Sequence, residues 1–447
     1  MSRRLIAIGI VLLLSSTKVG SISGFEAPPL LYTATAEYKA LAWMTGGDRF
    51  PKSAKLFIRD GQGDRELVNH FAASADPTLS FDATRVLFAG KQTPREHWQI
   101  WEVHLAGGAP RQVSSCRNDC VRPLYLPGDR LTFAEKVNGL FVIVVAPLAG
   151  GTATPVTYSP GNHLPTDILR DGRILFETAH AVGKGFVSEL YTVYTDGSGV
   201  EAYRCDHGSS RHSGKQLASG DIVFAQGYAL ARFTSSVAHE VRLAVPAAEY
   251  AGDVVETSNG DWLLASRASP NTKFAIFRWT PAAASRRALI TGRETSVVQP
   301  TLISERPLPN RHPSGLHDWD YANLLCLNAY TSKSAIGTRH IASVRLYARG
   351  ISGAEKALGE APVEKDGSFY LRTPADQPLK IELLDMQGRT IKKEAGWFWL
   401  RRGEQKVCVG CHAGPETAPE NAVPQVLLRS TLPADMTTSS RLAAGGH

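Results

Sequence analysis

The apolar residues in the first two thirds of the chain fall into short runs separated by polar turns. From about Leu31 to Ser304, runs of three or four apolar residues alternate with turns rich in Gly, Asp and Asn, and no segment shows the periodicity of an amphipathic helix. This pattern predicts an all-β fold built from short strands.

One unit recurs in this region: a polar turn, a charged residue, then three mostly apolar residues. The spacings between copies are 45, 43, 48 and 40 residues, with the charged residue at Arg85, Arg130, Arg173, Asp221 and Asp261. A period of this size with four strands per unit is typical of propeller blades. With an earlier half unit at Lys55–Asp64, the sequence predicts a six-bladed β-propeller over residues 25–306. Five or seven blades, or a β-sandwich, are the alternatives.

The pattern changes after a Pro-rich stretch at residues 307–317, which we interpret as a linker. Beyond it, alternating strands and Gly turns predict a β-sandwich over residues 318–435, with strands near Leu324–Tyr330, His340–Tyr347 and Leu379–Leu384 and a turn at Asp385–Gly388. Residues 436–447 are expected to be a disordered tail.

The N-terminus has the pattern of a secretory signal. Met1–Arg4 is basic and Leu5–Leu14 is an apolar run too short to span a bilayer, so residues 1–24 are predicted to be a signal peptide. An uncleaved anchor is the alternative. No later apolar run reaches about 18 residues, so we expect a periplasmic or secreted protein with no membrane span in the mature chain.

The charge of the chain gives little support to a nucleic-acid partner. The formal net charge is +7, and three of the basic residues lie in the predicted signal, which leaves +4. Because basic residues are scattered through the rest of the chain, we predict no nucleic-acid binding.

Six cysteines add candidate chemistry. Cys116 and Cys120 lie four residues apart in a turn-like sequence, which predicts a local disulfide in an oxidising compartment. A zinc pair is the alternative, although no second Cys/His pair with finger-like spacing follows. The sequence leaves the state of Cys205 and Cys326 open.

The C-terminal third contains the Cys-x-x-Cys-His motif, at Cys408, Cys411 and His412. The spacing lets two thiols form thioethers to the two vinyl groups of one porphyrin, while the adjacent His reaches the iron. We therefore predict one covalent haem c, with His412 as the iron ligand. A disulfide or a metal site at the two cysteines is the alternative.

The residue on the other side of the iron is not identified by spacing. The candidates are two methionines and three imidazoles: Met386, Met436, His312, His317 and His340. We interpret Met386 as a core residue and His340 as a strand residue. The choice matters because a closed iron favours electron transfer and an open one permits binding of a small ligand.

A polar segment within the repeat region gives a second candidate site. His207, Arg211 and His212 fall in a predicted blade connection, and such loops converge at the mouth of a propeller. They are candidates for a ligand pocket, with a solvated loop as the alternative interpretation.

Several motifs together resemble a known family. Leu324–Tyr330, Gly359–Phe369 and the Gly403–His412 segment resemble the middle domain of hydrazine synthase alpha subunits, over roughly Asp318–Asp435. The turns of the repeat resemble those of TolB-like and WD40-like propellers.

The resemblance implies a haem at the propeller interface and chemistry on small nitrogen compounds. In that family a tyrosine four residues beyond the motif histidine is thought to bind the iron, which frees the histidine for zinc. Here Glu416 takes that position, which favours His412 on the iron and leaves zinc at His412 and Cys326 as a lesser hypothesis. The family also continues into a second haem domain and works with partner subunits, whereas no second haem motif occurs in this sequence.

These observations predict an exported monohaem redox protein, either an electron carrier or an enzyme acting on a small ligand, with a redox partner protein. The rival hypothesis is a non-catalytic propeller scaffold that binds a protein or glycan, with the haem domain as an electron relay.

Overall fold

The computed structural model describes residues 28–182, 185–204, 210–332, 336, 339–349, 353–394, 396–410 and 421–437. Strands dominate these residues, and the all-β prediction is confirmed. The helical elements among them are short: η1 (Ala42–Thr45), η2 (Pro281–Ala283) and α1 (Gln425–Arg429). None of these helices is long and apolar enough to cross a bilayer.

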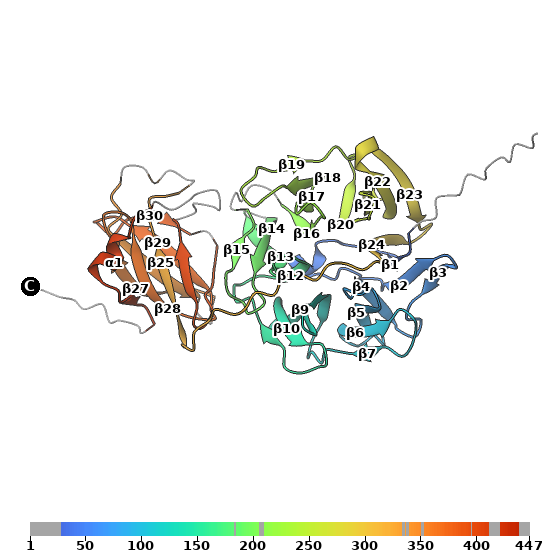
Figure 1. Ribbon diagram of the computed structural model, residues 1–447, viewed down its shortest axis with the longest axis horizontal. Helices are drawn as coiled ribbons and strands as arrows, with labels where there is room; N and C mark the ends of the chain where they lie inside the picture. Colours follow the sequence, from blue (N-terminus) through green and yellow to red (C-terminus); the bar gives the residue numbers. More distant parts are fainter. Residues whose placement is uncertain are drawn as a thin grey trace, which may run out of the picture.

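The region from β1 to β24 consists of four-stranded antiparallel sheets (Figure 1). In spatial order, the first three contain β24 (Ser296–Leu302), β1 (Leu30–Thr35), β2 (Lys55–Asp60) and β3 (Gly63–Glu66); β4 (Ala73–Leu79), β5 (Arg85–Lys91), β6 (Gln99–His104) and β7 (Arg111–Gln112); and β8 (Cys120–Leu126), β9 (Arg130–Val137), β10 (Leu140–Pro147) and β11 (Thr154–Pro155).

The next three sheets follow the same order along the chain. They contain β12 (His163–Ile168), β13 (Ile174–Val182), β14 (Gly185–Val193) and β15 (Glu201–Ala202); β16 (His212–Gln216), β17 (Ile222–Gln226), β18 (Ala229–Phe233) and β19 (Val241–Arg242); and β20 (Glu249–Glu256), β21 (Trp262–Arg267), β22 (Ala275–Thr280) and β23 (Ser285–Thr291).

We call the first strand of each sheet, in the spatial order given above, its leading strand. The leading strands contact one another in a closed ring, in the order β4, β8, β12, β16, β20 and β24. The ring closes because β24, from the end of the region, pairs with β1 from its start. The repeat in the sequence is explained by this geometry. Each repeated turn leads into the second strand of a sheet, at β5, β9, β13, β17 and β21.

The connection between β1 and β2 folds across one opening of the ring. Its aromatic side chains contact three different sheets: the Tyr38 ring lies 5.5 Å from that of Phe274, and the Phe50 ring lies 6.1 Å from that of Trp98. The Trp43 ring lies 6.1 Å from that of Phe141. The main hydrophobic core therefore includes side chains of this connection, and the ring of sheets is closed at this end of its axis.

A buried polar network joins the leading strands near the centre of the ring. Arg122 Nη1 lies 3.3 Å from Asp253 Oδ2, and the Arg122 backbone N–H donates to Asp76 Oδ2 at 3.1 Å. These residues share left-handed backbone with two others on equivalent strands, Ser213 and Gln299. Such backbone is uncommon for residues other than glycine, and here it accompanies a bulge in each of these five strands.

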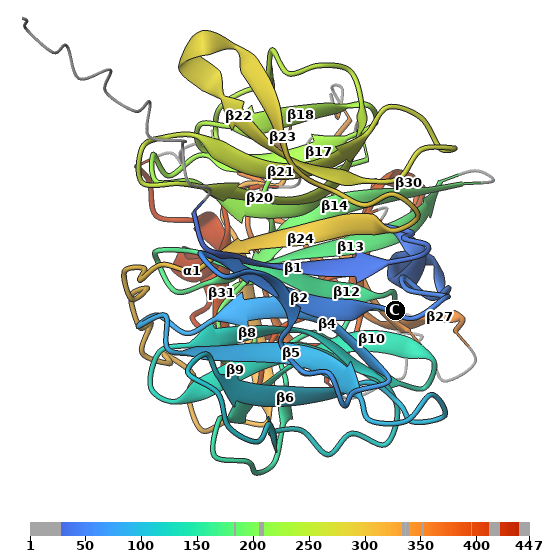
Figure 2. The same cartoon turned by 90° about the vertical axis from the view of Figure 1, so that its right-hand side faces the viewer.

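The C-terminal part forms two further four-stranded sheets. One contains β31 (Gln405–Cys408), β25 (Tyr321–Cys326), β28 (Phe369–Pro374) and β32 (Ala434–Asp435); the other contains β27 (Glu355–Pro362), β26 (Ser343–Arg349), β29 (Leu379–Leu384) and β30 (Thr390–Lys393). Apolar side chains of both sheets share one core, so the sheets pack as two layers. We call this part the C-terminal unit. It lies at one side of the ring, beside β14 and β15 (Figure 1), and is behind the ring in the view from the opposite side (Figure 2).

Two interpretations from the sequence are wrong here. Met386 is 77% exposed rather than buried in the core, because it lies in the turn between β29 and β30. His340 is exposed and precedes β26 rather than lying within it.

Candidate functional site at the domain junction

The segment that leads to the haem motif is positioned by β31, an edge strand. β31 pairs in parallel with β25, and Cys408 at its end lies opposite Cys326. The Cys408 carbonyl also accepts the backbone N–H of Leu327 at 2.8 Å. Cys411, His412 and Glu416 lie outside the residues that the structure describes. Of the three predicted haem-binding residues, the structure thus places Cys408 alone.

Cys408 lies at the junction with the propeller. It is half-buried and packs against the core of the C-terminal unit. Burial raises the pKa of its thiol, Lys406 opposes this, and the carboxylates of Glu394, Glu201 and Glu404 add to it. Because Glu201 belongs to β15 of the propeller, the thiol responds to charges from both parts of the molecule.

The chain just before β31 is held by the turn between β14 and β15. The Trp399 indole N–H donates to the Gly197 carbonyl at 3.0 Å, and Arg401 Nε donates to the Asp196 carbonyl at 2.8 Å. The Trp399 side chain is buried in an apolar cluster of the third and fourth sheets. These contacts join residues about two hundred positions apart, so the two parts of the molecule are tightly docked.

Glu404 is a buried carboxylate in this docking. It accepts the backbone N–H of Gly199 at 3.0 Å and that of Arg401 at 2.8 Å. Burial raises its pKa, while these two hydrogen bonds and nearby Lys406 lower it. The carboxylate thus joins the propeller turn to the strand that carries Cys408.

His163 lies under the docked Trp399, with ring centroids 6.2 Å apart. Its Nε2 is 3.1 Å from Ser159 Oγ, and its Nδ1 has no hydrogen-bond partner among the described residues. Burial lowers the pKa of this imidazole to about 4. The side chain is therefore neutral at physiological pH.

The residues of the predicted propeller pocket take different positions. Arg211 is buried, with its Nη2 2.9 Å from Glu240 Oε2 and its guanidinium over the Phe233 ring. His212 is also buried, 3.2 Å from Ser213 Oγ, and burial lowers its pKa. His207 and Cys205 lie outside the described residues. The pocket they were proposed to form stays a prediction.

The two imidazoles nearest the linker each stack on an aromatic ring. The His312 ring stacks on Tyr194 at 3.8 Å, and the His317 ring stacks on Trp319 at 4.4 Å. Met436, the remaining methionine candidate, is buried in the core of the C-terminal unit. None of these observations identifies a second iron ligand. Among the residues that the structure describes, no group of three or more His, Cys, Asp or Glu is arranged to hold a metal ion.

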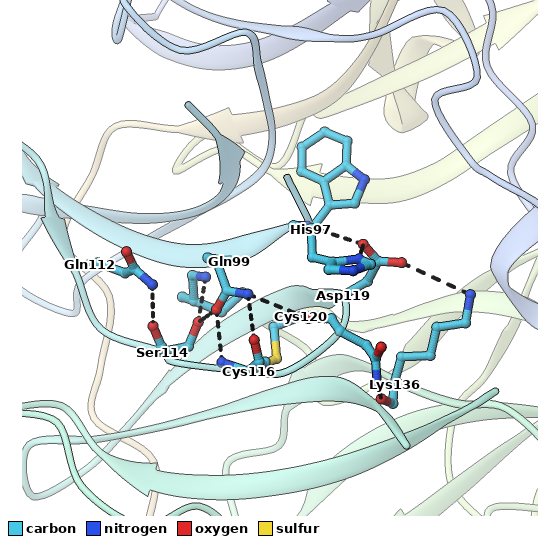
Figure 3. Close-up of a disulfide and its surroundings, with 11 residues drawn as sticks. His97, Gln99, Gln112, Ser114, Cys116, Asp119, Cys120 and Lys136 are labelled. Carbon is cyan, nitrogen blue, oxygen red and sulfur yellow. Dashed lines mark hydrogen bonds and ion pairs between the residues drawn. A yellow bond between two sulfur atoms is a disulfide. The ribbon is translucent and has the colours of Figure 1, made fainter. Parts of the chain in front are cut away.

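The predicted local disulfide is confirmed. The disulfide joins Cys116, in the connection after β7, to Cys120, the first residue of β8 (Figure 3). Gln99 stabilises this loop: its Nε2 donates to the Cys116 carbonyl and its Oε1 accepts the Cys116 N–H, both at 2.9 Å. The bridge therefore supports the second sheet and is remote in sequence from the haem motif.

The sequence motifs did not identify the docking residues Trp399, Arg401 and Glu404. Their roles depend on backbone atoms of a turn about two hundred residues earlier, which no local spacing reveals. A weak signal was present in the two tryptophans and two arginines that lie six to eleven residues before Cys408.

Comparison with known proteins defines the class of the C-terminal unit. Residues 332–413 match the family model of the hydrazine synthase alpha subunit middle domain. Part of the C-terminal unit is therefore similar to the middle domain of hydrazine synthase alpha subunits, and in this chain that unit follows an N-terminal β-propeller.

One curated relative and two solved structures are among the proteins to which this chain is similar. Hydrazine synthase subunit alpha from Kuenenia stuttgartiensis is 31% identical over 70 residues, which is 16% of this chain and 9% of that relative. The solved hydrazine synthase from the same organism has a TM-score of 0.78 at 16% identity and covers 90% of this chain and 71% of its own. TolB from Acinetobacter baumannii has a TM-score of 0.45 at 17% identity, over 62% of this chain and 67% of its own.

Proposed function

We propose that this chain is an exported redox protein in which a six-bladed propeller and a β-sandwich hold one haem c between them. Cys408 and Cys411 form the thioethers, and His412 binds the iron. The substrate class is small nitrogen compounds, in line with the name of the matched family, and a separate redox protein exchanges electrons with the haem. The six sheets closed by β24 and β1 are the blades of the propeller.

The observation that carries this proposal is the place of Cys408. The strand that ends at Cys408 brings this thiol to the junction, next to charged groups of both parts. The matched segment, residues 332–413, contains all three residues of the motif.

The surroundings of Cys408, the one motif residue that the structure describes, are compatible with an attached haem. Cys408 is not used in a disulfide, and it stands at the end of a strand, where the following residues leave the sheet. A bound haem supplies one-electron chemistry and an iron that takes small ligands. The protein's own part is to fix the segment that leads to Cys408, through the hydrogen bonds of Glu404 and Arg401 and the buried side chain of Trp399.

The test is expression in a bacterial host with and without the c-type maturation system. We expect the mature protein in the periplasmic fraction and a covalent c-type pyridine haemochrome spectrum that depends on the maturation system. Cys411→Ala should lose or weaken that signal. Cys116→Ala, which removes a cysteine far from the motif in the sequence, should keep it. A purified native chain with no covalent haem contradicts the proposal.

Ligand binding then separates the two redox roles. An enzyme acting on nitrogen compounds requires an open iron, so nitric oxide or hydroxylamine should change the absorption spectrum of the haem protein. A low-spin spectrum that neither ligand changes indicates an electron relay instead. Metal analysis of the same sample tests the lesser hypothesis of zinc at Cys326.

A further inference from the structure

The outermost strand of the sixth propeller sheet differs from the outermost strands of the other sheets. β7, β11, β15 and β19 are two residues long and β3 is four, whereas β23 has seven. β23 is the last strand of its sheet, and among the described residues no further strand pairs with it. It lies at the rim of the propeller, on the side away from the C-terminal unit (Figure 1). A long free edge is a template on which another chain can pair, and proteins usually keep such edges short.

The first half of β23 is open to solvent. Residues 285–288 are all exposed, and no backbone hydrogen bond joins them to a described segment other than β22. Every second residue of an edge strand directs its N–H and C=O away from the sheet. The second half is different, because Arg59 of the first sheet donates to the Leu289 carbonyl at 2.8 Å. An added strand would therefore pair along residues 285–288.

The side chains of this stretch carry positive charge that no described residue neutralises. β23 contains two arginines and no acidic residue, and neither arginine forms an ion pair among the described residues. The Arg286 guanidinium lies over the Phe277 ring, 4.3 Å from its centre. Arg287 lies opposite Arg278 of β22, whose guanidinium is paired with Asp261. Like charges that face each other across two strands are destabilising, so Arg287 does not stabilise this sheet.

We propose that β23 binds an extended acidic segment of a partner protein, which adds to this sheet as a fifth strand. Main-chain hydrogen bonds give such binding its affinity, and alternate side chains give it specificity. Because Arg286 and Arg287 are adjacent on a strand, they point to opposite faces of the sheet. An added strand with two neighbouring acidic residues places one carboxylate beside each arginine. This inference is independent of the proposed haem site.

A second copy of β23 fits this edge poorly. Two copies paired edge to edge would bring the arginines of both strands together, with no acidic residue on either. Like charges on neighbouring strands repel. Charge complementarity therefore favours an acidic partner over self-association.

The experiment is titration of the purified full chain with a short labelled peptide rich in Val, Thr, Glu and Asp. Binding is followed by fluorescence anisotropy, and its place by hydrogen exchange with mass spectrometry. A matched peptide carries Gln and Asn instead of Glu and Asp. We expect the acidic peptide alone to bind, to bind more weakly as salt is added, and to slow amide exchange in β23.

Substitutions of the two arginines test the charge contribution. Arg286→Gln and Arg287→Gln should each weaken binding by about twofold to fivefold, as for one exposed ion pair, and the double variant by about tenfold. Arg287→Gln should not lower Tm, because it removes the charge that faces Arg278. Arg242→Gln is the matched control, since Arg242 is an exposed arginine on β19, the outermost strand of the neighbouring sheet. It should leave binding unchanged.

Four results would overturn the proposal. Slowed exchange in other segments rather than β23 would place the peptide elsewhere. Equal binding of the two peptides would remove the role of charge. Failure of the acidic peptide to bind would leave the arginines with protection of the free edge as their role. A dimer of the free protein with slowed exchange in β23 would make a second copy the occupant of this edge.

Discussion

At the scale of single residues, the most informative side chain is His163, a buried neutral imidazole beneath the docking tryptophan. Burial lowers its pKa to about 4, whereas an unfolded histidine titrates near 6.5. Between these two pH values the imidazole of His163 is protonated in the unfolded chain but neutral in the folded protein. Stability is therefore lost as the pH falls from about 6.5 towards 4, by up to about 3 kcal/mol.

We predict that His163→Gln flattens this part of the pH profile. Thermal unfolding followed between pH 7.5 and pH 4.5 should show a smaller loss of Tm in the variant than in the native protein. His104→Gln is the control, because it replaces an exposed histidine of the propeller and leaves the buried His163 in place. An equal loss of Tm in the native and His163→Gln proteins would exclude this role.

Sequence reasoning succeeded for residues whose partners are close in the chain and failed for those whose partners are distant. The Cys116–Cys120 bridge followed from a four-residue spacing. The prediction that Met386 lies in the core was wrong because it rested on the apolar side chain alone. Met386 belongs to the turn Asp385–Gly388, which exposes that side chain to solvent. Arg122, Trp399 and Glu404 each have a partner that lies 131 to 205 residues away, and only folding brings such partners together.

At the scale of elements, the leading strand of each propeller sheet combines a regular register with a bulge. The repeat of charged turns predicted where the second strands begin, because those turns are local. The bulges were not predicted, since each depends on contacts with the neighbouring sheet. Gly252 shows the constraint: it has φ of +91°, and a Cβ added there would lie 2.1 Å from the Cβ of Ser213 on β16.

A pair of glycine substitutions tests that constraint. Gly260 also has a positive φ, of +81°, but a Cβ there meets nothing within 4 Å. Gly260→Ala should therefore cost only the backbone strain, about 1–2 kcal/mol. Gly252→Ala should cost this and about 1–3 kcal/mol more from overlap with β16. Denaturant unfolding midpoints of the two variants should differ accordingly, and equal midpoints would show that the sheets separate freely at this point.

At the scale of the whole molecule, the propeller and the C-terminal unit are joined by more than the chain between them. Residues 303–320 contain no helix or strand, yet they lie against the propeller, where the Asn310 N–H donates to the Arg170 carbonyl at 2.8 Å. The main joint is the side chain of Trp399, 2% exposed and inserted among residues of the third and fourth sheets. The proposed haem site depends on this joint, because β31, which ends at Cys408, is linked across it to the propeller through the Lys406–Glu201 ion pair.

Trp399→Ala should uncouple the two units. Truncating a buried tryptophan typically costs about 3–5 kcal/mol, and here that loss falls on the docking rather than on either core. We expect one unfolding transition in the native protein to become two in the variant, with new protease cleavage between residues 303 and 320. Trp397→Ala is the matched control, because Trp397 contacts Lys380 within the C-terminal unit, with the ammonium group 4.4 Å from the ring centre. If Trp399→Ala unfolds in one transition and resists cleavage as the native protein does, the units are held together by contacts other than this side chain.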